Sequence, residues 1–288
     1  MSIFEIIQAK DFNALQNLLN ENPQSINERY MTNNLTVLQF AVIIGDEQIL
    51  DFIISSLDKN KIDELDAENM TALHWAAKVG RYKILSELIN KGANIEARDI
   101  FHLTPLHLAV SNDKQYSFES TKALLENKAN IDAKAPDKTT PLHTAVVKRD
   151  KFLVQLLINY NADINAEDKN GNPPIYKAVY NADKEIIKLL KEKNANLSHK
   201  GSEEESLLHV VAAGYNDNFE QVKETILYLM DEGLNIKALD KKGLRPFHYT
   251  SKHSLREFIK DLANNPLKRD NSNFVDKVSQ APSSPTLH

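Results

Sequence analysis

Apolar and polar positions alternate along this chain in a short signature that recurs seven times. Its clearest copies read Thr-Pro-Leu-His-x-Ala, with Leu and Ala three positions apart, as on one face of a helix. Successive copies start 33 to 39 residues apart, at Thr36, Thr71, Thr104, Thr140, Pro173, Ser206 and Arg245. A regular period of this length indicates a chain built from one repeated supersecondary unit.

Each unit is predicted to contain two helices. In the clearest copies Thr104 caps the first helix through its hydroxyl, and Pro105 takes the first helical position, where a missing N–H costs nothing. Gly45 and Gly80 stand at equivalent places after the signature and break the chain between the helices. An apolar stripe at helical spacing then predicts a second helix, as in Ile84, Leu85, Leu88 and Ile89.

The signature, the period and a Gly-Ala-x-Ile pattern after the second helix resemble the ankyrin repeat family over roughly residues 1–264. The resemblance implies an all-α solenoid of helix-turn-helix units joined by hairpin loops. About eight units are expected, starting near residues 1, 36, 71, 104, 140, 173, 206 and 245. Residues 1–35, with Lys10 aligned to Gly45, form the N-terminal capping unit. Residues 265–288 are rich in turn residues and predict a disordered tail.

The composition narrows the classes of partner. Charged residues make up 26% of the chain and the net charge is −5, without the clustered Lys and Arg of a nucleic-acid site. Cysteine is absent, which excludes disulfides and thiolate metal sites. No apolar run is long enough to span a membrane, and the N-terminus lacks a signal peptide. We therefore expect a cytoplasmic monomer.

Two repeated polar positions invite a chemical interpretation. The signature places His74, His107, His143, His209 and His248 one to a unit, and the hairpins begin with Asp66, Asp99, Asp168 and Asp240. One such residue in each layer favours structural roles, in bonding to the backbone and in turn formation, over metal or Ca²⁺ ligation. With no phosphate-binding or nucleophile motif in the sequence, we expect no catalytic, cofactor or metal site.

Candidate binding residues lie outside the frame that the repeat requires. The resemblance implies that hairpin tips and first helices line a concave groove that contacts partners. Met70, Ile100, Phe101 and Leu103 form an apolar cluster on consecutive tips, which indicates either binding or tips that pack on each other. Short insertions also separate the helices of the units starting at Thr104 and Ser206. The first insertion carries Tyr116 and Phe118, which extend the cluster if that loop folds toward the groove.

Trp75 is the only tryptophan, and its place in the signature equals that of Leu108, which favours packing over an interface role. The sequence thus predicts a non-catalytic module that binds an unidentified protein through the concave face of the solenoid. The alternative is a bacterial effector that binds a host protein through the same face. Such an effector reaches the host cytoplasm by a system that needs no signal peptide, with the tail as its signal. An enzyme, the third class, has no supporting motif.

Overall fold

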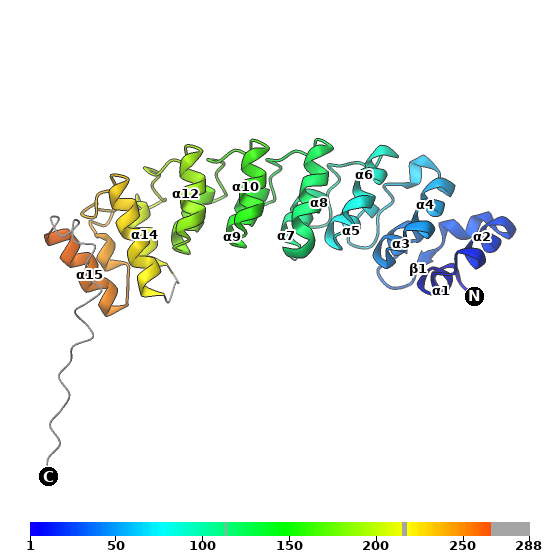
Figure 1. Cartoon of the computed structure of the whole chain (residues 1–288), viewed down its shortest axis with the longest axis horizontal. Helices are drawn as coiled ribbons and strands as arrows, with labels where there is room; N and C mark the ends of the chain where they lie inside the picture. The colour runs from blue at the N-terminus through cyan, green and yellow to red at the C-terminus, as the bar shows by residue number, and fades with distance from the viewer. Residues whose placement is uncertain (113, 215–217, 266–288) are drawn as a thin grey trace, which may run out of the picture.

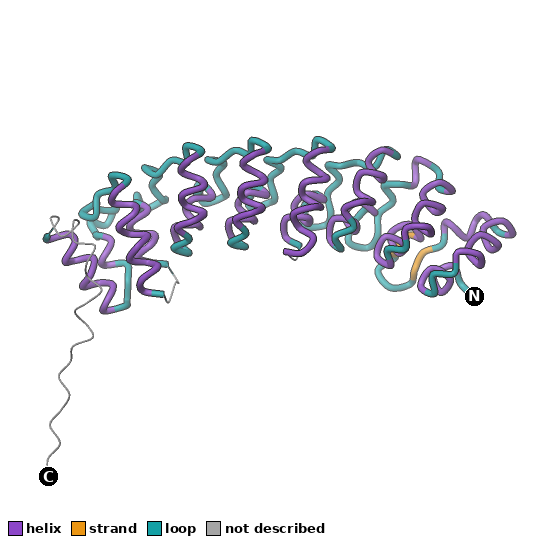
Figure 2. The backbone as a smooth tube through the Cα atoms, viewed as in Figure 1, coloured by secondary structure: helices purple, strands orange, loops and turns teal. Residues whose placement is uncertain are grey.

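The computed structural model describes residues 1–112, 114–214 and 218–265, and these residues are mainly helical (Figures 1 and 2). Strands β1 (Arg29–Tyr30) and β2 (Leu35–Thr36) pair antiparallel before the first complete unit. Short 3-10 helices are η1 Pro23–Asn27, η2 Lys59–Lys61 and η3 Pro246–His248. The α-helices are α1 Ile3–Gln8, α2 Phe12–Glu21, α3 Val37–Ile44, α4 Glu47–Ser56, α5 Ala72–Lys78, α6 Tyr82–Asn90, α7 Pro105–Ser111, α8 Lys114–Glu126, α9 Pro141–Val147, α10 Lys151–Asn159, α11 Pro174–Tyr180, α12 Lys184–Glu192, α13 Leu207–Ala213, α14 Phe219–Asp231 and α15 His253–Asn264.

Successive helix pairs stand side by side and form an elongated arc (Figure 1). The first helices make one row, in which each packs on the next from α3 to α13 and then on η3. The second helices make a parallel row in which α6, α8, α10, α12 and α14 contact one another in order. This two-row stack is the predicted all-α solenoid.

The signature supplies the core between layers. Its Leu position is buried in every complete unit, and Leu73 and Leu142 have no exposed surface. Ala76, Ala109 and Ala145 are fully buried at the close of the signature, where a small side chain lets neighbouring first helices approach closely. The periodic apolar residues therefore form one continuous core along the stack.

The signature Thr and His together start each first helix. In the unit that begins at Thr71, the backbone N–H of Thr71 donates to His74 Nδ1 at 3.1 Å, and the Thr71 hydroxyl lies 2.9 Å from the same nitrogen. The units starting at Thr104, Thr140 and Ser206 repeat this capping box. Because Nδ1 accepts the backbone hydrogen bond, the neutral ring carries its proton on Nε2.

In the units of His74, His143 and His209, that Nε2–H reaches a backbone carbonyl of the next unit. His74 Nε2 lies 3.1 Å from the carbonyl of Leu103, and His143 Nε2 lies 3.1 Å from that of Asn172. In the unit starting at Thr36, Gln39 does the same work: its Oε1 accepts from Thr36 N–H at 2.8 Å and its Nε2 donates to the Met70 carbonyl at 2.7 Å. The signature His therefore has the predicted structural role in these units, whereas His107 Nε2 is buried without a hydrogen-bond partner.

Left-handed backbone recurs at the turns. Lys10, Gly45 and Gly80 all have positive φ between the two helices of their units, so the alignment of the N-terminal cap is correct. The second helices end on positive φ at Gly92 and Gly233, and also at Lys128, Asn161 and Asn194. A non-glycine residue there carries the strain of a conformation that L-residues disfavour.

The described residues of the two insertions fall largely within second helices. Residues 114–118 belong to α8, which has 13 residues against 9 in α6 and α10. Helix α14 also has 13 residues and starts at Phe219. Each insertion thus lengthens a second helix by a turn at its N-terminal end, although residues 215–217 lie outside the described part.

The C-terminal unit is reduced to η3 and α15, and the predicted tail lies outside the described residues apart from residue 265. None of the described helices is both long and apolar enough to cross a membrane.

Candidate functional site

In four of the hairpin tips, one Asp side chain accepts two backbone hydrogen bonds. Asp99 Oδ1 accepts the backbone N–H groups of Phe101 at 2.9 Å and Leu103 at 2.8 Å. Between them His102 takes a positive φ of 58°. Asp66, Asp168 and Asp240 hold their own tips through the same pair of bonds. These four tips are therefore ordered by hydrogen bonds within the chain itself.

Backbone hydrogen bonds also join one tip to the next. Ile100 N–H donates to the Glu68 carbonyl at 2.9 Å, and equivalent bonds start from Ala67, Lys169 and Lys241. Pro136 occupies the place of Ile100 in its own tip and has no N–H to donate. Ser202, at the same place in a later tip, also makes no such bond in the described structure, so the row is interrupted at two tips.

The predicted apolar cluster is smaller than the sequence suggested. Ile100 and Phe101 are 46% and 62% exposed, and Leu103 is half-buried. Met70 is only 2% exposed, so its expected place on the surface is wrong. Its N–H donates to Asp66 and its carbonyl accepts from Gln39, which holds Met70 at the base of the tip. Ile100 and Phe101 remain as the exposed apolar tip.

The inserted aromatic residues do not extend that tip. Ile100 bonds to Glu68, which precedes α5, whereas Tyr116 lies against Gly80, which follows α5. The two sets are therefore at opposite ends of the first helices. Tyr116 is 42% exposed and Phe118 is half-buried. The expectation that they join the tip cluster is wrong because residues 114–118 extend α8 instead of folding back.

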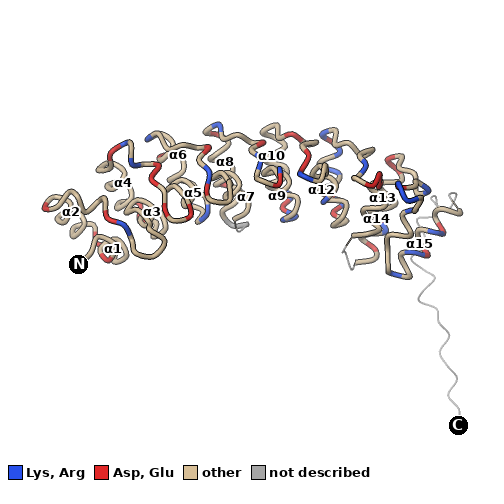
Figure 3. Tube along the Cα trace, turned by 180° about the vertical axis from the view of Figure 1, so that it is seen from behind, with Lys and Arg blue, Asp and Glu red and all other residues tan. Residues whose placement is uncertain are grey.

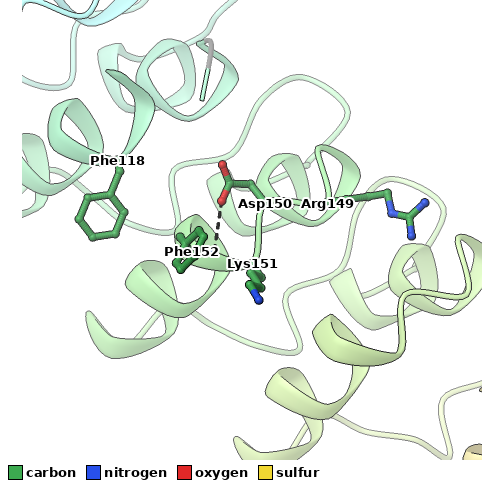
Figure 4. Close-up of a pocket in the computed structure, with 5 residues that line it drawn as sticks. All are labelled: Phe118, Arg149, Asp150, Lys151 and Phe152. Carbon is green, nitrogen blue, oxygen red and sulfur yellow. Dashed lines mark hydrogen bonds between the residues drawn. The ribbon is translucent and has the colours of Figure 1, made fainter. Parts of the chain in front are cut away.

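Sequence reasoning missed one exposed aromatic residue. Phe152 near the start of α10 is 67% exposed, and with Phe118 it lines an open groove of about 610 Å³. Figure 4 shows both rings bordering the same space, while the Arg149 guanidinium points away from it. The available signal was that Phe152 stands where the apolar stripe of α10 does not need an apolar residue.

Trp75 has the packing role that the sequence favoured. Its indole N–H donates to Asp66 Oδ2 at 2.7 Å, and Lys78 Nζ lies 4.7 Å from the ring centroid. Tyr249 repeats the arrangement with a 2.6 Å bond from its hydroxyl to Asp240. Burial, with help from that hydrogen bond, raises the pKa of Tyr249. Each of these aromatic side chains therefore donates a hydrogen bond to the Asp that organises its tip.

The ionisable groups are distributed along the stack. Lys and Arg alternate with Asp and Glu over its length (Figure 3). Among the described residues, no group of three or more His, Asp or Glu side chains is placed to hold a metal ion. Burial lowers the pKa of His74, His107 and His143, which keeps these imidazoles neutral near pH 7.

Comparisons with known proteins agree with this architecture. Residues 3–99 and 106–201 match the family described as ankyrin repeats. A putative ankyrin repeat protein of Rickettsia bellii is 39% identical over 77 residues, which are 27% of this chain and 30% of that protein. The chain thus spans about a third of that relative. The crystal structure of the ankyrin repeat domain of Bcl-3, a member of the IkappaB family, superposes with a TM-score of 0.67. The two sequences are 23% identical, and the superposed region covers 81% of this chain and 100% of the Bcl-3 chain. Because the matched segments cover most of the stack and the capped, connected unit recurs along it, this chain belongs to the ankyrin repeat family.

Proposed function

We propose that this chain is a non-catalytic protein-binding module that contacts its partner through the tip formed by Ile100 and Phe101. The observation that carries the proposal is the 62% exposure of Phe101 on a tip that two Asp99 hydrogen bonds hold rigid. An aromatic side chain in that position contributes nothing to the core between layers. Aromatic anchors of this kind dominate the energetics of protein interfaces.

The rigid tip also lowers the cost of binding. A loop that is already ordered loses little conformational freedom when a partner docks, so more of the contact energy appears as affinity. The bond from Ile100 N–H to Glu68 fixes the neighbouring tip as well. Two adjacent tips can therefore engage one partner together.

The test begins with affinity capture on the full chain and identification of the partner by mass spectrometry. Calorimetry then compares the wild type with Phe101→Ala. We expect binding to weaken by about 2 kcal/mol, while the melting temperature stays unchanged because the side chain lies outside the core. The matched control is Asn170→Ala, at the same place on a polar tip, which should alter affinity less. Loss of stability with intact affinity per folded molecule would show that the tip serves packing.

The second candidate function is that of an effector, which is delivered into a host cell and binds a host protein there. The first candidate acts in the cytoplasm of the cell that produces it. The similarity to an ankyrin repeat protein of a bacterium supports a bacterial setting for this chain. Fusion of the full chain to a reporter that is active only in host cytoplasm tests delivery. A reporter signal that depends on residues 265–288 favours the effector, and its absence from infected cells favours residence in the producing cell.

A further inference from the structure

A second exposed apolar surface lies at the far end of the first helices from the tips. It is the groove between α8 and α10, which we call the corner groove and define by Phe118, Arg149, Asp150, Lys151 and Phe152. Phe118 stands near the N-terminal end of α8, Arg149 and Asp150 directly precede α10, and Lys151 and Phe152 are its first two residues (Figure 4). Its volume of about 610 Å³ is within the range of sites that hold a bulky side chain or small ligand.

The fold does not require an aromatic residue at Phe152. Helix α10 fills its buried face with Leu153, Val154, Leu156 and Leu157. The same place in α6 is Lys83, which is exposed and paired with Glu47 at 3.0 Å. An aromatic ring that is 67% exposed beside a second ring, where a sister unit carries a charge, indicates a surface for a partner.

The charges at the corner groove favour an acidic partner. The single carboxylate, Asp150, accepts the N–H groups of Phe152 and Leu153 at 3.1 Å each, so it caps α10. Arg149 is paired with Asp183 at 3.0 Å. Lys151 has no carboxylate partner among the described residues, and its ammonium lies 5.5 Å from the Phe152 ring centroid. A cation is therefore left beside the apolar rings for a carboxylate that the partner would bring.

The surface continues across α8. Tyr116, one half-turn before Phe118, lines a smaller hollow of about 160 Å³ with Gly80 and Tyr82. Tyr116 and Tyr82 are 42% and 40% exposed. The extra turn of α8 thus carries aromatic residues toward both neighbouring second helices, which offers an extended segment more than one place of contact.

We propose that the corner groove binds an acidic peptide segment of another protein. One bulky apolar side chain of that segment lies between Phe118 and Phe152, and an adjacent carboxylate pairs with Lys151. This site is separate from the Ile100 and Phe101 tip and does not depend on the function proposed for it. The chain then holds two binding surfaces at opposite ends of its first helices.

The experiment selects random 12-residue peptides displayed on phage against the immobilised full chain. The enriched peptides are synthesised with a fluorescent label and their anisotropy is titrated. We expect them to combine an aromatic or large aliphatic residue with Asp or Glu. Phe152→Ser and Lys151→Glu should each weaken binding at least tenfold, and both side chains are at the surface, so circular dichroism should be unchanged.

Two control variants localise the effect. Phe101→Ala removes the tip anchor, and Lys237→Glu reverses an exposed charge on a distant hairpin, and both should leave peptide affinity within a factor of two. No enrichment, selection of neutral or basic peptides, or binding that is indifferent to Phe152→Ser would overturn the proposal. Loss of peptide binding in Phe101→Ala would assign the peptides to the tip and also overturn it.

Two other occupants are tested in parallel. Sedimentation of the wild type that reveals a dimer, dispersed by Phe152→Ser, would assign the corner groove to a second copy of the chain. Displacement of the selected peptides by a synthetic peptide of residues 266–288 would assign it to the chain's own C-terminus. Either result would replace the acidic partner, whereas a monomer that keeps its peptide in the presence of that competitor supports it.

Discussion

Two neighbouring joints of the stack are built from the same repeat and held differently. The regular joint connects the units that start at Thr71 and Thr104. There His74 Nε2 bonds to the Leu103 carbonyl at 3.1 Å, and Ile100 N–H bonds to the Glu68 carbonyl at 2.9 Å. Both bonds run between backbone or capping groups, so they fix the layers independently of the apolar core.

The interrupted joint connects the units that start at Thr104 and Thr140. Pro136 has no N–H for the neighbouring tip, and His107 Nε2 faces the Thr139 backbone without a hydrogen bond of ordinary geometry. Arg98 partly compensates, since its guanidinium donates to the Lys134 carbonyl at 3.1 Å. The corner groove opens at this same joint. The two joints thus share a continuous apolar core and differ in the hydrogen bonds between their layers.

The largest expected effect is a loss of stability in acid, caused by the buried signature histidines. Burial lowers the pKa of His74, His107 and His143 below the ordinary 6.5, so the unfolded chain takes up protons that the native chain does not. Their stabilising effect is complete above pH 6.5 and is lost as the pH falls toward the lower native pKa. Each contributes at most about 1.4 kcal/mol per pH unit. Urea titrations between pH 7.5 and 5 should therefore show falling stability.

Substitutions of His74 and His107, measured in the same urea titrations, compare the stability of the regular and the interrupted joint. His74→Gln should flatten the acid dependence and keep stability at pH 7.5, because Gln39 already makes both bonds in its own unit. At that pH His74→Ala should cost about 1 kcal/mol more than His107→Ala, since only His74 loses a bond to the next layer. Equal losses would mean that the two joints are held alike.

Buried hydroxyls weaken the helix that borders the corner groove. Ser120 and Thr121 of α8 are fully buried, and neither hydroxyl has a hydrogen-bond partner in the described structure. Thr121→Val keeps the shape and removes the unpaired group, so we expect a gain of about 1 kcal/mol in chemical denaturation. The matched control is Thr225→Val on α14, whose hydroxyl donates to the Gln221 carbonyl at 2.9 Å. A gain in both variants would contradict the assignment.

The smallest expected effect converts the regular joint into an interrupted one. Ile100→Pro removes the donor to Glu68 and should cost about 1 kcal/mol or less, because proline also reduces the freedom of the unfolded chain. Ile100→Ala shortens the same side chain and retains the N–H, so it serves as the control. The two variants are compared by urea midpoint, and identical midpoints would show that the bond between tips adds no stability.

The sequence was sufficient for features that repeat. The signature, the break at Gly45 and Gly80, and the alignment of Lys10 with them are all confirmed, because each reports a local rule of capping or of positive φ. The structural role of His74 and the packed place of Trp75 were also predictable, since a residue that recurs once per layer, or at a fixed place in the signature, acts within the layer frame.

Features that depend on contacts between units were not predictable. Met70 is apolar and adjacent to a tip, but hydrogen bonds of its backbone with Asp66 and Gln39 hold it at the base of the tip, where its side chain is buried. The extra turn of α8 was not predictable because Ser120 and Thr121 replace the apolar stripe that marks a second helix elsewhere. For Phe152 the signal was only local, its place outside the apolar stripe of α10, because an exposed aromatic residue on one unit has no counterpart in the others.

The extra turns of α8 and α14 have a consequence for how this chain tolerates insertions and deletions. The unit that contains α14 is the longest interval between signatures, yet Lys241 N–H still meets the Glu203 carbonyl across it at 2.9 Å, as Ile100 meets Glu68 across a shorter unit. Residues added at the corner between helices lengthen a helix away from the tips. The bond between neighbouring tips therefore does not depend on the number of residues per unit, so corner residues can be gained or lost without a change in the register of the tips.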